Sequence, residues 1–143
     1  MPAQLESPAR STVVDYGRPT PTSKKAVWIG WILGVIPCLL LLFSAAMKFA
    51  RPAPVVEGFT KLGWPDRLAL ALGILELTCT ILYLIPRTAV LGAILLTGYL
   101  GGATATHVRI GDPFIMTVLL GVVLWLGLYL REPRLRALIP LRS

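Results

Sequence analysis

The sequence predicts an all-α integral membrane protein, a four-transmembrane-helix antiparallel bundle with a short interfacial helix between the first and second spans. Its 143 residues are 55% hydrophobic with a mean hydropathy of +0.73, which is too apolar for a water-soluble domain of this length. Four apolar stretches are long enough to cross a hydrocarbon core of about 30 Å. The acidic residues lie almost entirely in the polar segments between these stretches, and Glu76 is the exception.

Residues 1–26 form a polar arm with no apolar periodicity, and its prolines are Pro2, Pro8, Pro19 and Pro21. This composition predicts a disordered cytoplasmic arm. The first span follows at residues 27–49, which as a helix would measure roughly 34 Å. A cleaved secretory signal is disfavoured because the preceding arm is long and further apolar spans follow.

The segment between Arg51 and Trp64 is amphipathic, with Val55, Phe59 and other apolar side chains on one face of a helix. Gly63 can close the turn after that helix. We therefore expect a short helix that lies on the membrane surface.

Three more spans follow, at residues 67–85, 88–108 and 114–130. Pro86 ends the first of these, and the tight turn after it makes spans two and three antiparallel neighbours. The C-terminal residues 131–143 alternate leucines with arginines in the pattern of a basic interfacial tail.

The third span carries small residues at close spacing, Gly98, Gly101, Gly102 and Ala105. Small residues let helices approach closely in lipid, where apolar burial does not drive helix association. We interpret this spacing as a helix-packing surface.

Basic residues set the expected orientation. With a cytoplasmic N-terminus, the inner side carries nine of them: Arg10, Arg18, Lys24, Lys25, Arg87, Arg131, Arg134, Arg136 and Arg142. The outer side then carries five: Lys48, Arg51, Lys61, Arg67 and Arg109. An excess of basic residues marks the cytoplasmic side, so both termini are expected there.

The sequence contains no catalytic signature. It has one histidine, no cysteine and histidine cluster at metal-ligand spacing, and no glycine-rich phosphate loop. Cys38 and Cys79 lie inside apolar stretches, where a thiol behaves as a small hydrophobic group. The net charge of +7 is spread along the edges of the spans, which fits lipid headgroups and not nucleic acid.

Glu76 is the main candidate for a functional residue, because it lies about 13.5 Å into the second span, near the bilayer midplane. A carboxyl group there is costly and should face the bundle interior. Lys48, His107 and Tyr99 are its candidate partners, and together the four residues form a candidate buried polar site. We expect Glu76 to be protonated unless Lys48 or His107 reaches it directly. The alternative is a packing role, as an interhelical hydrogen-bonding group.

Several short motifs in this order resemble the DoxX-like family of small bacterial membrane proteins. They are Phe43-Ser44-Ala45-Ala46-Met47-Lys48-Phe49, Val56-Glu57-Gly58-Phe59, Leu62-Gly63-Trp64-Pro65, Leu72-Gly73-Ile74-Leu75-Glu76-Leu77, Tyr83-Leu84-Ile85-Pro86-Arg87-Thr88 and His107-Val108-Arg109. The resemblance covers about residues 27–142. It implies a four-helix bundle in the bacterial cytoplasmic membrane, and some relatives are associated with quinone-linked sulfur oxidation or with oxidative stress.

Three functions follow as hypotheses. The first is a non-catalytic membrane subunit or scaffold that binds a lipid- or quinone-like molecule near Glu76, together with membrane lipids and a protein partner in a membrane complex. The second is a subunit of a quinone-linked redox complex, whose cofactor another protein would supply. The third is a small-solute or proton conduit, for which an embedded carboxylate is typical.

Overall fold

A computed structural model describes residues 23–138, and all regular structure within that range is helical. The helices are α1 (Lys24–Ala50), α2 (Ala53–Lys61), α3 (Leu68–Leu84), α4 (Ala89–Arg109), α5 (Ile115–Arg131) and α6 (Pro133–Leu138). The four long helices begin and end within a few residues of the expected apolar stretches. The predicted arm at residues 1–26 lies mostly outside the described residues.

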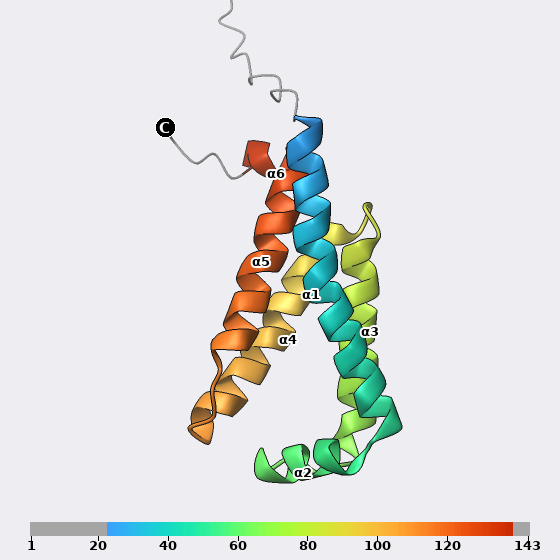
Figure 1. Cartoon of the computed structure of the whole chain (residues 1–143), viewed down its shortest axis with the longest axis vertical. Helices are drawn as coiled ribbons and strands as arrows, with labels where there is room; N and C mark the ends of the chain where they lie inside the picture. Colours follow the sequence, from blue (N-terminus) through green and yellow to red (C-terminus); the bar gives the residue numbers. More distant parts are fainter. Residues whose placement is uncertain (1–22, 139–143) are drawn as a thin grey trace, which may run out of the picture.

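The four long helices run alternately up and down, and each packs against two neighbours (Figure 1). α1 contacts α3 and α5, and α4 contacts the same two helices from the other side. Tight connections explain this order: Pro86 follows α3, and Gly111, with φ of 72°, turns the chain between α4 and α5. The result is a ring of four antiparallel helices.

The outer surface of this ring is strongly apolar. Large side chains such as Trp28, Ile115 and Met116 are exposed by 70%, 64% and 64%. An apolar surface of this extent is unfavourable in water and suits a lipid environment. α1 and α4 are long and apolar enough to cross a membrane, whereas α3 and α5 are apolar but shorter, at 17 residues each.

One of the close helix contacts in the bundle joins α1 to α5 through glycines, and another joins Gly92 of α4 to the Tyr83 backbone of α3. A Cβ added to Gly127 would lie 2.8 Å from the Gly34 nitrogen, and one added to Gly30 would lie 2.8 Å from the Gly127 oxygen. These obstacles are backbone atoms, which cannot move aside as a side chain can. Glycine is therefore required at this contact, as at other close helix crossings in lipid.

The small residues of α4 do not have the packing role that their spacing predicts. A Cβ added to Gly98, Gly101 or Gly102 would meet no atom of the described structure within 4 Å. The predicted packing surface at these glycines was therefore wrong for contacts within this chain. The spacing of small residues shows which of them share one face of a helix, but it does not show which face contacts a neighbouring helix.

Arginine side chains satisfy backbone carbonyls at the end of the bundle where α3 and α5 finish. Arg131 Nη2 donates to the Tyr83 carbonyl of α3 at 2.8 Å, and its guanidinium lies 4.3 Å from the Trp31 ring centre. Arg136 Nε donates to the Tyr129 carbonyl of α5 at 2.8 Å. The last carbonyls of a helix lack partners within it, and a cation there also complements the helix dipole.

The start of the C-terminal tail is attached to the bundle. Leu135 is 5% exposed and belongs to the hydrophobic core, and α6 packs against α5. The segment Arg131–Leu138 therefore packs against the bundle through α6 and Leu135. Residues 139–143 of the predicted interfacial tail lie outside the described residues.

We predict that Gly127→Leu destabilises the bundle, because the new side chain must displace the backbone of α1. Overpacking of this kind costs typically about 1–3 kcal/mol. The apparent melting temperature in detergent should fall by about 5–10 °C. Gly101→Leu is the matched control, since it adds the same side chain to a glycine with open space around it. Equal melting temperatures for the two variants would contradict the assigned contact.

Candidate functional site

The bundle opens toward the end where α2 lies. Figure 1 shows α1 and α3 diverging from α4 and α5 at that end, with α2 lying across the gap. Side chains of α1, α2, α3 and α4 line a cavity of about 750 Å³ there, which is partly open to the outside of the bundle. Its wall is largely apolar, and the large side chains on it are Phe43, Met47, Phe59, Leu62, Trp64, Leu72 and Leu75. Cavities of this size and polarity are typical of sites for small amphipathic molecules.

Lys48 places a charged group on the cavity wall. Its Nζ donates to the Glu76 carboxylate at 2.9 Å and to Ser44 Oγ at 2.6 Å. The Glu76 side chain is 2% exposed and that of Lys48 is 15% exposed. Glu76 therefore faces the interior, as the sequence predicts, and Lys48 lies between it and the cavity.

The register of α1 against α3 brings these two residues together. A Cβ on Gly73 would lie 3.1 Å from the Lys48 Cβ, so Lys48 is level with Gly73. Glu76 is three residues further along α3, about 4.5 Å along the helix axis. From the sequence, Lys48 near the end of the first span and Glu76 near the bilayer midplane are expected to lie about half a membrane apart. This expectation was wrong, because the axial shift between the two helices is a tertiary property. Lys48 is in direct contact with Glu76, which is the exception that the sequence expectation allowed, and the two side chains form a salt bridge.

Ser44 is a member of the site that sequence reasoning missed. It lies four residues before Lys48 on α1, a spacing that places two side chains next to each other on a helix. That spacing was a usable signal. A buried ammonium group is costly without full hydrogen bonding, and Ser44 supplies one of the acceptors that it needs.

Tyr99 of α4 is the third candidate residue at this end of the cavity. Its side chain lies on the wall of the same cavity as Lys48. Within the described residues, the hydrogen-bond partner of the Glu76 carboxylate is Lys48, and no hydrogen bond joins Glu76 to the Tyr99 hydroxyl. Lys48, Glu76 and Tyr99 thus form one polar cluster contributed by α1, α3 and α4.

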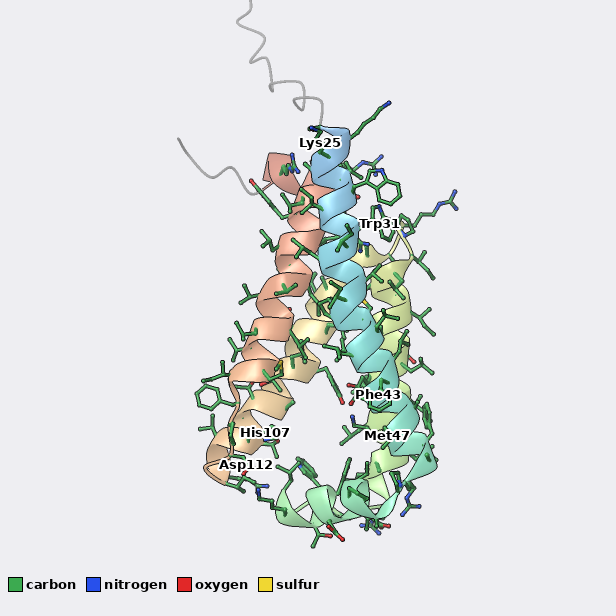
Figure 2. The ribbon with its side chains drawn as sticks, viewed as in Figure 1. Lys25, Trp31, Phe43, Met47, His107 and Asp112 are labelled. Carbon is green, nitrogen blue, oxygen red and sulfur yellow. The ribbon has the colours of Figure 1, made fainter. Side chains whose placement is uncertain are left out.

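His107, the fourth candidate residue, is not a partner of Glu76. It lies near the end of α4, opposite Phe43 and Met47 of α1, with Asp112 just below it (Figure 2). Its Nδ1 is 3.8 Å from the Asp112 carboxylate and makes no hydrogen bond to the described residues. The structure therefore separates His107 from the polar cluster and places it at the α2 end of the cavity.

Polar contacts hold α2 across the cavity. Lys61 at its end pairs with Asp112 at 2.7 Å, and Arg109 of α4 donates to the Leu62 carbonyl. At the other end Arg51, in a left-handed conformation with φ of 49°, pairs with Asp66. The Phe59 side chain of α2 is buried at 7% exposed and lines the cavity. This short helix therefore forms the cavity floor.

The described residues contain no group of three or more histidine, cysteine or acidic side chains that could hold a metal ion. Cys38 and Cys79 are both free thiols buried in the core. The polar groups on the cavity wall are the Lys48 ammonium, the His107 imidazole and the hydroxyls of Ser44, Tyr99 and Thr106.

Comparison with known proteins places the chain in a family. The model of the DoxX-like family matches residues 32–129, which is more than half of the chain and includes Lys48, Glu76, Tyr99 and His107. The chain matches no curated protein and no solved structure. The family match, the apolar outer surface and the long apolar helices lead to one conclusion: this chain is a multi-pass membrane protein that belongs to the DoxX-like family.

Proposed function

We propose that this protein is a non-catalytic membrane subunit or scaffold that binds a lipid- or quinone-like molecule in the cavity above α2. The observation that carries the proposal is the cavity itself, about 750 Å³ in volume and apolar except for the polar cluster at Lys48. A ligand with a long apolar body and an oxygen-bearing head matches that distribution. Membrane lipids and a protein partner in a membrane complex complete the proposed setting.

In this proposal α1, α3, α4 and α5 all span the bilayer, and α2 lies at its surface. α3 and α5, with 17 residues each, extend about 25 Å. Local thinning of the bilayer, or snorkelling of flanking side chains to the interface, accommodates this length at modest cost. The membrane is the bacterial cytoplasmic membrane, as the family resemblance implies. The excess of basic residues at the termini supports a cytoplasmic position for both ends.

Packing at the other end of the bundle favours a binding site over a conduit. A solute path would need polar or hydrated groups from one side of the bundle to the other. Beyond the cavity, the interior is filled by Tyr83, Leu96, Leu124 and Leu128, each exposed by 1% or less. The glycine contact between α1 and α5 closes the same end. A cavity closed at one end therefore supports the proposal of a binding site.

The proposed orientation predicts the outcome of labelling in intact cells. Single cysteines at Ser11 and Thr60, in a variant that lacks Cys38 and Cys79, test the two sides of the membrane. Thr60 is exposed on α2, so Thr60→Cys should react with an impermeant thiol reagent, whereas Ser11→Cys should react only after the cells are opened. Labelling of Ser11→Cys in intact cells would overturn the orientation.

The proposed ligand site predicts that substitutions at two adjacent glycines of α4 differ in their effect on the amount of bound ligand. Gly102 lines the cavity and Gly101 does not, and a Cβ added to either would have no neighbour within 4 Å. Gly102→Leu should fill ligand space and reduce the co-purified lipid or quinone by about tenfold, as expected when bulk displaces a bound apolar group. Gly101→Leu should retain it.

The measurement is mass spectrometry of organic extracts from protein purified in detergent, normalised to folded protein. Melting temperatures of both variants should match that of the parent, which separates loss of ligand from loss of fold. Equal ligand content in the parent and Gly102→Leu, or no bound molecule in the parent, would refute the cavity as a binding site.

A further inference from the structure

We propose that the cavity selects electrically neutral amphiphiles, in which an uncharged carbonyl or hydroxyl oxygen accepts a hydrogen bond from Lys48. This inference rests on the proposed function and specifies the chemical class of the ligand. Two properties of Lys48 support it, the direction of its hydrogen bonds and the neutralisation of its charge.

Lys48 retains one donor for a ligand. An ammonium group has three N–H donors and accepts none. One is directed to Glu76 at 2.9 Å and a second to Ser44 at 2.6 Å. Because Lys48 lines the cavity while Glu76 lies behind it, the third donor is available on the cavity side. An acceptor oxygen on the ligand would complete the set.

The positive charge of Lys48 is already neutralised. Glu76 is buried at 2% exposed and pairs with this ammonium group directly. An anionic headgroup at the third donor would lie close to the Glu76 carboxylate in an environment that screens charge poorly, so the two negative charges would repel. A neutral oxygen makes the same hydrogen bond without that repulsion.

No other fixed cation in the described part of the cavity wall could attract an anion. Lys48 is the single lysine or arginine among the lining residues, and His107 at the α2 end is 3.8 Å from the Asp112 carboxylate. Arg51 and Lys61 at that end are paired with Asp66 and Asp112. The net charge of the residues that line the cavity, taken together with Glu76, is therefore close to zero, and the third N–H of Lys48 is available to a ligand on the cavity side.

The experiment compares two probes with the same acyl chain on the purified full chain at neutral pH. Monooleoylglycerol has an uncharged head, and oleoyl lysophosphatidic acid carries a phosphate on the same glycerol. Decylubiquinone is a second neutral probe. Comparing its affinity with that of monooleoylglycerol shows whether the cavity prefers a quinone or a neutral lipid. Affinities are measured by native mass spectrometry titration from detergent.

The parent should bind the neutral lipid or the quinone about tenfold more tightly than the phosphate lipid, because only the phosphate is repelled by the Glu76 carboxylate. Glu76→Gln keeps the side-chain shape but leaves Lys48 unneutralised. It should raise affinity for the phosphate lipid by about tenfold and remove the preference for the neutral probes. Glu57→Gln is the matched control, because it removes one negative charge from the exposed α2 surface outside the cavity and should change neither affinity.

A parent that prefers the phosphate lipid, or a folded Glu76→Gln variant with an unchanged preference, would overturn the neutral-ligand inference while leaving the binding function in place. If Glu76→Gln fails to fold, the preference of the parent decides the inference. Failure of all three probes to bind the parent would instead refute the proposed function along with this inference.

Discussion

The glycine contact between α1 and α5 is the constraint on which the rest of the structure depends. At Gly30 and Gly127 the two backbones are so close that no side chain fits between them. This contact holds one end of the bundle closed, while larger side chains and α2 occupy the other end (Figure 1). Helices held close at one end and apart at the other leave a cavity, so the close packing and the proposed site are two results of one geometry.

The two ends of the bundle use basic residues differently. At the closed end, Arg131 and Arg136 donate to terminal carbonyls of α3 and α5, so their charges stabilise helix ends. At the open end, Lys48 pairs with a buried carboxylate beside an apolar cavity. Buried ion pairs contribute little net stability compared with well-packed apolar residues. This small net contribution to the fold is consistent with the role that we propose for the pair at the ligand site.

Much of the fold was predictable because helix formation in an apolar chain is local. The four apolar stretches are helical close to their expected bounds, and Gly63 turns the chain after α2 with φ of 72°, as expected. The inward direction of Glu76 was also predictable, because an exposed carboxyl in lipid would be too costly. The separation of His107 from Glu76 was not, since the position of a residue along one helix does not reveal which residues of another helix face it.

The sequence by itself determined the composition of each helix, the DoxX-like family and the presence of one carboxyl group inside the apolar segments. Only the tertiary structure decided which groups meet. It placed Lys48 within 2.9 Å of Glu76, made Gly30 and Gly127 the packing glycines, and left Gly102 facing a cavity. The physical reason is that helix periodicity sets which side chains share a face, whereas axial register and neighbour choice depend on packing among all the helices together.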